Sequence, residues 1–294
     1  MGRVRRPERD PLEGLRELAG DRRSGASEIF QRALNLLVDS ARLGLPRESV
    51  LECVRALCDS HPEMVPLLNL SAVVESLTGW PAGAVGRLEA LREHARYARL
   101  RAAEAAAARI EDARRVVTLS WSSTTFEALR RAALSGSLRE VVVAQSLPLG
   151  EGLETARRLA SLSLKVVVIP DSAIPSHIRE ADAGLVGADA VLGDGSLVNK
   201  VGTLSLALAC DAFGIPLVAT TDLLKVDVWG RFRRPETSSC DGLPEPPKGV
   251  ELECPIFEVT PARFISVYAT EEGPISPLDM VDRAGQLLRR LVEG

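Results

Sequence analysis

The pattern of apolar residues changes near residue 115, and this change constrains the fold more than any other feature of the chain. Upstream, apolar residues recur at helical spacing, as in 26–43, and no run has the composition of a strand. Downstream, short runs of β-branched and other apolar residues alternate with helical segments. Alternation of this kind is typical of a parallel sheet covered by helices on both faces. We therefore expect an α/β chain, with an N-terminal helical domain followed by a parallel-sheet domain.

The expected element boundaries follow from the same pattern. The expected helices of the first half are 26–43, 47–58, 66–78 and 83–114. The expected strands of the second half are 116–120, 141–146, 165–171, 183–189, 216–221 and 264–270, and its expected helices are 124–134, 150–163, 174–181 and 203–213. We expect a flexible N-terminus over 1–20, a helical domain over 21–114 and the α/β domain over 115–294. Two domains agree with a prior of about 150 residues per domain.

Composition argues against several functional classes. A net charge of −4 argues against a general nucleic-acid-binding surface. No apolar run reaches the roughly 18 residues of a membrane span, and the charged start of the chain is not expected to be a secretory signal. The five Cys residues include no CxxC pair and do not form a disulfide scaffold, so a reducing, cytoplasmic compartment fits best. The spacing of Cys53, Cys58 and His61 fits no usual zinc pattern, and we expect no metal and no cofactor.

One long segment, 229–256, interrupts the alternation. It is rich in Pro, Gly and charged residues, and we interpret it as a surface loop between two strands. Two roles stay open for it, a lid over a site or a disordered excursion. The basic residues Arg231, Arg233 and Arg234 near its start are either surface charge or contacts for a phosphate.

Polar residues gather where the expected strands end, which is where ligands bind in parallel α/β sheets. Asp189 ends an apolar strand, a position suited to a general acid or base, although a capping or turn carboxylate explains it as well. Further along, the pair Asn199-Lys200 precedes Gly202 and the start of a helix. Free N–H groups at a helix start beside a lysine make an anion site. The common nucleotide motifs are absent, since the nearest approach to GxGxxG, at 193–198, lacks its third glycine.

Three stretches together resemble a known family. They are GADAVLGDGSLVNKVGTLSLALACDAFGIPLVATTDLLKVD (187–227), PDSAI (170–174) and FEVTPARFISVYATEEGPISPLDM (257–280). The family comprises the alpha, beta and delta subunits of translation initiation factor 2B, ribose-1,5-bisphosphate isomerase and methylthioribose-1-phosphate isomerase. The resemblance extends over most of the chain, and it implies that the second domain is Rossmann-like and that members dimerise through it.

The resemblance also implies a chemistry and a set of site residues. The enzymes of the family interconvert an aldose 1-phosphate and a ketose 1-phosphate with a Cys and an Asp, which move hydrogen between C1 and C2, and they use no metal or nucleotide cofactor. Asp189 matches the catalytic Asp. The implied substrate-binding positions are Gly25 and Ala26, in the motif that wraps phosphate, the pair Asn199 and Lys200, and Lys225.

The chain departs from the isomerases at three positions. Ser120 stands at the position of the catalytic Cys, and a hydroxyl is a far poorer acid or base than a thiol. His61 replaces an arginine that grips phosphate, and Leu147 stands where the isomerases have a second arginine. Ser120 stays in the candidate set at the catalytic position, and Ser122 and His61 stay in it as ligands.

The remaining His and Cys residues are expected to have structural roles. We expect His94 and His177 to lie at the surface or to be satisfied by a partner, and Cys210 to lie in the core. Cys240 and Cys254 flank the long loop and are not expected to replace the missing catalytic thiol, because neither follows a strand.

Three functions stay open. The chain is a divergent sugar-phosphate isomerase in which Asp189 is the main catalytic group, a non-catalytic regulatory protein that resembles the initiation-factor subunits and acts through protein contacts, or an oligomeric scaffold with a vestigial pocket. The presence of Asp189, Asn199 and Lys200 argues against a pure scaffold. The expected partners are a phosphorylated sugar or nucleotide and further copies of the chain, in a homodimer or higher homo-oligomer, with no membrane and no direct nucleic acid.

Overall fold

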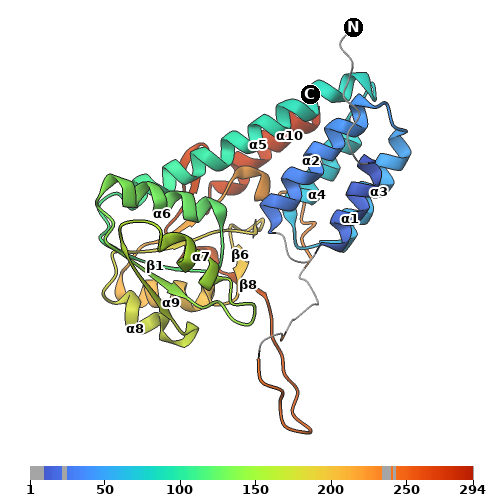
Figure 1. Cartoon of the computed structure of the whole chain (residues 1–294). Helices are drawn as coiled ribbons and strands as arrows, with labels where there is room; N and C mark the ends of the chain where they lie inside the picture. The colour runs from blue at the N-terminus through green and yellow to red at the C-terminus, as the bar shows by residue number, and fades with distance from the viewer. Residues whose placement is uncertain (1–9, 22–24, 234–239, 241–242, 294) are drawn as a thin grey trace.

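A computed structural model describes residues 10–21, 25–233, 240 and 243–293. Before residue 115, the described residues form helices and no strands, as the pattern of apolar residues predicts. These helices are α1 (Pro11–Gly20), α2 (Ala26–Arg42), α3 (Arg47–Ser60), α4 (Val65–Ser76) and α5 (Ala82–Arg109). The long helix α5 runs from the helical region onto the α/β region, where it contacts α6, β7 and β9 (Figure 1).

The second half is an α/β region, so the predicted fold class is confirmed. Its main strands are β1 (Arg115–Leu119), β2 (Glu140–Ala144), β3 (Lys165–Ile169), β4 (Ala183–Val186), β7 (Leu217–Thr220), β9 (Val267–Thr270) and β10 (Gly273–Ile275). The helices between and after them are α6 (Ser123–Ser135), α7 (Gly152–Leu159), α8 (Ile174–Ile178), α9 (Thr203–Phe213) and α10 (Met280–Glu293). The strands lie in the order β10-β9-β7-β4-β1-β2-β3, and every pair is parallel except β9 with β10.

This strand order contains a switch point between β1 and β4. The chain moves from β1 outward through β2 to β3, then returns to place β4 on the other side of β1. The loops that leave β1 and β4 therefore diverge, and a crevice opens at their carboxyl ends, where ligands bind in doubly wound sheets. The fold itself thus marks the exits of these two strands as the place for a site.

The N-terminal segment is a correction to the sequence analysis. Residues 11–20 were expected to be part of a flexible terminus, but they form α1. The side chain of Asp10 caps this helix by accepting a hydrogen bond from the Leu12 N–H at 2.9 Å, and Pro11 suits its first turn. Leu15 and Leu18 are fully buried, and α1 packs against α2 and α3. Residues 1–9 lie outside the described residues.

Two other elements were not predicted. A three-stranded sheet pairs β6 (Leu197–Lys200) with the short β5 (Ala190–Val191) on one side and β8 (Phe257–Thr260) on the other. Helix α10 returns to the helical region, where it contacts α4, and Arg87 of α5 donates a hydrogen bond to the carbonyl oxygen of Leu291 at 2.6 Å. The C-terminal helix therefore joins the two regions. It lies after the expected domain boundary at 115, but it packs on helices that lie before that boundary.

The start of the long loop is held against the molecule. The carboxylate of Asp227 accepts hydrogen bonds from the N–H groups of Arg231 and Phe232, both at 2.9 Å. Arg233 N–H donates to the carbonyl oxygen of Pro62, between α3 and α4, at 3.1 Å. Arg234, the third member of the basic cluster, lies outside the described residues. Later in the loop, the described backbone leaves the body as an extended excursion (Figure 1).

Cysteine pairing was not anticipated. Cys240 and Cys254 form a disulfide with their Cα atoms 5.3 Å apart, while Cys53, Cys58 and Cys210 are free and buried. The bridge closes the excursion of the long loop at its base. Across the described part of the chain, none of the helices is long and apolar enough to cross a membrane.

The packing of α1 can be tested with the substitution Leu15→Ala. Because the Leu15 side chain is fully buried, we expect the free energy of unfolding to fall by about 2–5 kcal/mol. The measurement is urea unfolding at a fixed pH. The matched control is Leu134→Ala on α6, where the leucine is 68% exposed and the loss is expected to stay within about 0.5 kcal/mol. Equal losses in the two variants would show that α1 does not contribute to the core.

Candidate active site

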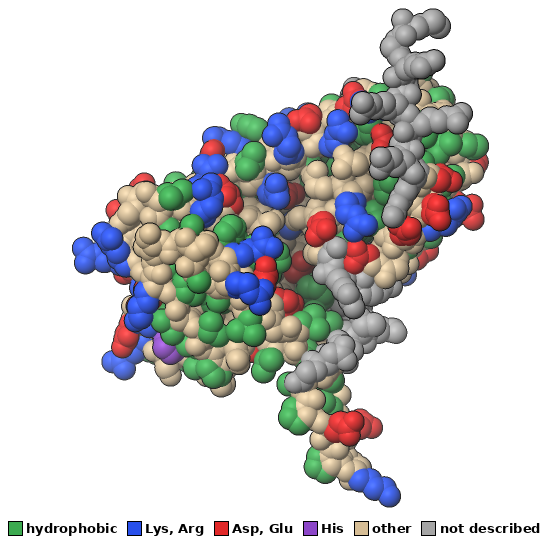
Figure 2. All heavy atoms as spheres, in the orientation of Figure 1, with side chains coloured by type: hydrophobic (Ala, Val, Ile, Leu, Met, Phe, Trp, Pro, Cys, Tyr) green, Lys and Arg blue, Asp and Glu red, His purple; other side chains and the backbone are tan. Residues whose placement is uncertain are grey.

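The candidate site lies at the exits of β1 and β4, on either side of the switch point. Ser120 directly follows β1, and Asp189 comes three residues after β4. Gly187 brings the two exits close, because a side chain at this position would lie within 2.8 Å of the Ser122 hydroxyl oxygen. Figure 2 shows acidic and basic side chains on both sides of a hollow between the α/β and helical regions. A site at this place is therefore formed by both regions.

Asp189 is largely shielded from solvent, and its backbone N–H donates to the carbonyl oxygen of Val198 at 3.0 Å. Burial is the largest influence on the carboxyl group and raises its pKa to about 6. Lys225 and Lys200 oppose this shift by electrostatic attraction, while Glu63 and Glu151 reinforce it. A carboxyl group with such a pKa exchanges a proton readily near neutral pH, which suits a general acid or base.

The two lysines reach the site from different elements. Lys225 lies in the 3-10 turn η2 (Leu223–Lys225) after β7, and its ammonium donates to the carbonyl oxygen of Ala188 at 2.7 Å. Lys200 ends β6, is 2% exposed, and forms an ion pair with Glu151 at 2.9 Å. Both ammonium groups are therefore fixed near Asp189. The ammonium group of Lys225 is held against Ala188, the residue that precedes Asp189.

Asn199 and Lys200 follow each other in β6, so their side chains point to opposite faces of the strand. Its amide donates to the hydroxyl oxygen of Thr203 at 3.0 Å, and that hydroxyl donates to the Lys200 carbonyl oxygen at 2.7 Å. Asn199 thus ties β6 to the first residue of α9.

The predicted anion site at the start of α9 is wrong. The N–H groups of Gly202 and Leu204 both donate to one carboxylate oxygen of Glu258, at 2.7 and 2.8 Å. Glu258 belongs to β8, which pairs with β6, so the chain supplies its own anion to this helix start. The signal was weak in the sequence because Glu258 lies more than fifty residues away.

The start of α2 lies close to Lys225. Gly25 is the exposed N-cap of this helix and Ala26 is its buried first residue. A small cavity joins the first turns of α2 to the region after β7. It is lined by Ser27, Phe30, Gln31, Pro66, Ala95, Arg99, Asp222, Leu224 and Lys225. The cavity therefore begins at Ser27, directly after the predicted phosphate motif Gly25-Ala26, and it reaches Lys225. Its lining adds Arg99 of α5 as a second cation and Asp222 as an acidic group.

Ser120 has an unusual backbone, with φ at +58°, in the left-handed region that few residues other than glycine adopt. Its N–H donates to the Ser146 hydroxyl at 2.6 Å, and its carbonyl oxygen accepts from Thr155 at 2.5 Å. Asp171 in turn accepts from the N–H groups of Ser146 and Leu147, at 2.7 and 2.9 Å. The strained exits of β1 and β2 are thus held together by one network, which was not predicted.

Ser122 and His61 lie apart from the cavity at the start of α2. The Ser122 hydroxyl caps α6 by accepting from the Thr125 N–H at 3.3 Å. His61 is 1% exposed, and its Nε2 atom lies 3.0 Å from the carbonyl oxygen of Leu18 in α1. The contact of Ser122 therefore stabilises the α/β region, and the contact of His61 stabilises the helical region.

Asn69 is a further residue that the sequence analysis missed. Its buried amide donates to the carbonyl oxygens of Leu224 and Val226, at 2.7 and 3.0 Å. These two carbonyls flank Lys225, so α4 holds the lysine-bearing turn from the side of the helical region. A polar asparagine in the apolar first half of this helix was the only signal for it.

A second acidic group lies beside Lys225. Burial is the largest influence on Asp222 and raises its pKa to about 6, against the attraction of Lys225. Glu271 accepts from the Leu223 N–H and lies 3.7 Å from the ring nitrogen Nε2 of His94. The nearby Glu271 carboxylate raises the pKa of His94. His94 therefore lies beside a carboxylate, but its Nε2 atom has no hydrogen-bond partner among the described residues.

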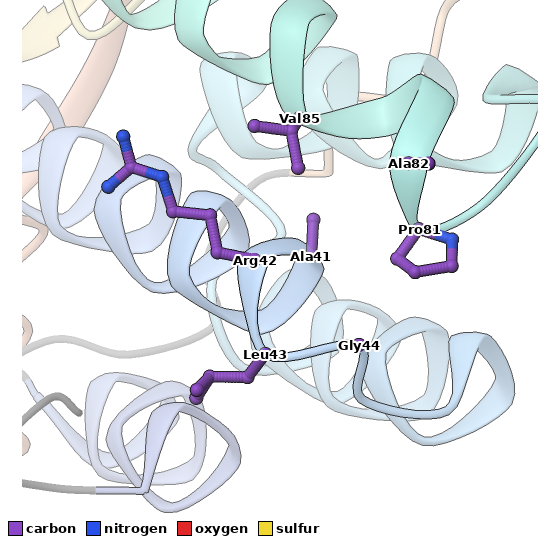
Figure 3. Close-up of a pocket in the computed structure, with 7 residues that line it drawn as sticks. All are labelled: Ala41, Arg42, Leu43, Gly44, Pro81, Ala82 and Val85. Atoms are coloured by element: carbon purple, nitrogen blue, oxygen red, sulfur yellow. The ribbon is translucent and has the colours of Figure 1, made fainter. Parts of the chain in front are cut away.

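Another hollow, of about 700 Å³, lies far from these groups, between the end of α2 and the start of α5. It is lined by Ala41, Arg42, Leu43, Gly44, Pro81, Ala82 and Val85, with Arg42 as its charged member (Figure 3). Arg42 pairs with Glu89 at 2.5 Å. Because this lining offers no pair of acid and base groups, we do not assign the site there.

The chain was compared with known proteins. Residues 9–277 match the model of the initiation factor 2 subunit family. A translation initiation factor eIF-2B subunit 2-like protein of Pyrococcus furiosus is 30% identical, over 91% of this chain and 97% of that protein. A ribose 1,5-bisphosphate isomerase of Haloterrigena turkmenica is 27% identical, over 94% and 93% of the two chains.

Solved structures give the same result. The translation initiation factor eIF-2B of Pyrococcus horikoshii matches with a TM-score of 0.78 and 28% identity, over 92% of this chain and 98% of that one. A 5-methylthioribose 1-phosphate isomerase of the same organism matches in fold with a TM-score of 0.69 and 21% identity, over 96% and 88% of the two chains. The matches extend over both the helical and the α/β regions.

The raised pKa of Asp189 predicts a pH dependence of stability. Since the folded-state pKa of about 6 lies above the ordinary value of 3.8, the folded protein holds this proton more tightly than the unfolded chain. The resulting stability is complete below about pH 4 and is lost as the pH rises through 6. Between pH 4 and pH 7, we expect wild type to lose about 1–3 kcal/mol more unfolding free energy than Asp189→Asn.

Urea unfolding at several pH values measures this difference. The control is Asp112→Asn, which removes an exposed carboxylate and is expected to follow the wild-type curve. If Asp189→Asn also followed that curve, the carboxyl group would have no raised pKa.

Proposed function

The chain belongs to the initiation factor 2 subunit family, and from that premise we propose that it binds a phosphorylated pentose at the exits of β1 and β4. The observation that carries the proposal is the convergence on Asp189 of cations from separate segments. Lys200 and Lys225 both act on its carboxyl group, and Lys225 also lines the cavity at the start of α2. A cationic cavity beside a carboxyl group matches a ligand with phosphate at one end and hydroxyl groups at the other.

In this proposal, phosphate lies at the start of α2. The N–H groups around Gly25 and Ala26 point out of the helix start and, with its dipole, favour an anion. Lys225 and Arg99 add positive charge from the other side of the cavity. Ribose 1,5-bisphosphate is the first ligand to test, because an isomerase of that name is similar over nearly the whole chain.

Asp189 is the group that we propose for acid–base work. With a pKa of about 6, it is able to take a proton from one sugar hydroxyl and return it to the neighbouring oxygen. Ser120, held by its own backbone contacts, supplies only a hydrogen bond. In the interconversion of an aldose 1-phosphate and a ketose 1-phosphate, the hydrogen on C2 would move with its electron pair to C1 as the bond between C1 and the ring oxygen breaks, and Asp189 would carry the proton of the C2 hydroxyl to that ring oxygen.

One observation favours a second candidate, a non-catalytic regulatory protein that binds the same class of ligand and acts through protein contacts. None of the five cysteines is suited to replace the missing catalytic thiol. Cys240 and Cys254 are joined in a disulfide. Burial raises the pKa of Cys58 and of Cys210 to about 12, and it also raises the pKa of Cys53. A thiolate is therefore strongly disfavoured at all three free cysteines.

We further propose that the protein works as a homodimer or a larger homo-oligomer in the cytoplasm. The three buried free thiols suit a reducing compartment, whereas the disulfide at the base of the long loop is a bridge that such a compartment would tend to reduce. The proposed cytoplasmic location therefore rests on Cys53, Cys58 and Cys210, the three cysteines without a disulfide.

A panel of sugar phosphates tests the proposal. The protein is incubated with ribose 1,5-bisphosphate, other aldose 1-phosphates and the parent sugars, with thermal shift to read binding and NMR to read ketose formation. A ligand at 100 times its dissociation constant is expected to add about 2.7 kcal/mol of stability. Binding with conversion supports the isomerase, binding without conversion supports the regulatory protein, and no binding contradicts both.

The variant Asp189→Asn separates binding from chemistry. We expect it to keep the thermal shift and to lose ketose formation, because an amide does not exchange a proton as the carboxyl group does. Asp112→Asn serves as the matched control and is expected to keep both. Unchanged conversion in Asp189→Asn would refute the assigned role.

A further inference from the structure

The groups of the candidate site lie in the order of the strands that they follow. Along the carboxyl edge of the sheet this order is β7, β4, β1 and β2. Lys225 follows β7 and Asp189 follows β4, whereas Glu151 lies in the connection from β2 to α7. The proposed function places the phosphate of the ligand near Lys225 and its reacting carbons near Asp189. The other end of the ligand is therefore expected to point toward the exit of β2.

Glu151 brings a carboxylate to this end of the site. The buried ammonium of Lys200 donates to one of its oxygens at 3.1 Å and lies 2.9 Å from the other. Both residues also act electrostatically on the carboxyl group of Asp189, so the ion pair lies beside the proposed acid–base group. The positive charge of Lys200 is therefore already compensated by a carboxylate of the chain itself.

Glu151 is fixed in this place by the start of α7. The residue is the N-cap of that helix, and its side chain makes no capping hydrogen bond, so the carboxylate is free to reach Lys200. A Cβ atom on Gly152 would collide with the carbonyl oxygen of Ala144, the last residue of β2, so a glycine is needed for this close approach. The positive end of the helix dipole also favours a carboxylate here.

The backbone N–H groups at the exit of β2 are largely used by the chain. Those of Ser146 and Leu147 donate to the carboxylate of Asp171, and that of Gly150 donates to the carbonyl oxygen of Ser146 at 3.0 Å. The exposed side chains at this exit include Leu147 and Leu149, which are apolar. A phosphate that entered here would therefore meet occupied donors, apolar groups and the carboxylate of Glu151.

The two arginines of α7 are paired with a different carboxylate. Arg157 and Arg158 both form ion pairs with Glu154, one turn after Glu151. The guanidinium of Arg158 also lies over the ring of Trp121, 4.3 Å from its centroid. These contacts hold both arginines, so Lys200 is the cation that Glu151 controls.

We propose that Glu151 is a specificity-determining residue, whose carboxylate occupies Lys200 and keeps a phosphate away from the exit of β2. The ligand is then a pentose with one phosphate, on C1. A hydroxyl at its other end accepts a hydrogen bond from Lys200 and donates one to Glu151, whereas a second phosphate is repelled by the carboxylate. This inference rests on the proposed function and narrows its ligand to sugars with a single phosphate.

Thermal-shift titrations of the full chain with ribose 1-phosphate and ribose 1,5-bisphosphate test this inference. The rise of the melting temperature with ligand concentration gives a dissociation constant for each compound, and it reads the compound and any product alike. We expect wild type to bind ribose 1-phosphate at least about tenfold more tightly than the bisphosphate. We expect Glu151→Gln to reduce this preference at least about tenfold, because an amide leaves the Lys200 ammonium free for a phosphate.

Glu154→Gln is the matched control. It removes one negative charge from the same helix, at a carboxylate that pairs with arginines, and it is expected to keep the wild-type preference. Circular dichroism verifies that each variant is folded. A wild type that prefers the bisphosphate, or equal changes of preference in Glu151→Gln and Glu154→Gln, would overturn this inference and leave the proposed function intact. If wild type bound neither compound, the proposed function would be wrong, and this inference with it.

A second substitution identifies the cation that Glu151 occupies. When Lys200→Gln is added to Glu151→Gln, the preference for ribose 1-phosphate is expected to return to near its wild-type value, because no ammonium is left for the second phosphate. A merely structural role of the ion pair would weaken the binding of both compounds and leave their ratio unchanged. If the double variant kept the improved binding of the bisphosphate, the proposed pairing of Glu151 with Lys200 in specificity would be refuted.

Discussion

The attraction between Lys225 and Asp189 is the interaction on which the candidate site depends. Burial raises the pKa of this carboxyl group, because a charge in a poorly solvated place is costly. Lys225 offsets part of that cost, and the balance leaves the pKa near 6. The lysine is in turn fixed by the Ala188 carbonyl, and its turn is held by Asn69 of α4. The packing of the helical region on the sheet therefore sets the proton affinity of a group on the sheet.

Much of the fold could be predicted because strands and helices carry local patterns. The apolar runs at β1, β2, β3, β4 and β7 are nearly continuous, as expected for strands covered on both faces. The strands β6 and β8 were missed because their pairing joins segments far apart in the sequence. Helix α1 was missed because its apolar residues are few and lie among charges, although Asp10 and Pro11 form a recognisable start.

The site shows the same division between local and distant information. Asp189 and Lys225 could be predicted from their places after strands: Asp189 follows β4, at the switch point, and Lys225 follows the neighbouring strand β7. The use of Glu258 at the start of α9, and of Asn69 beside Lys225, depends on partners that no local pattern names. Of the four lysines in the chain, Lys200 and Lys225 are buried, and both act on the carboxyl group of Asp189.

The positions of the five cysteines show how this chain differs from an enzyme that depends on a thiol. Three cysteines are buried in the core and two form a disulfide in the long loop, so no cysteine is left for the strand exits. At the position after β1, the backbone of Ser120 is held in a strained conformation by Ser146 and Thr155, although the side chain itself is a weak acid. Strain of this kind persists only where the surroundings impose it. The backbone at the exit of β1 is thus fixed by its neighbours, while the side chain at that position is a poor acid or base.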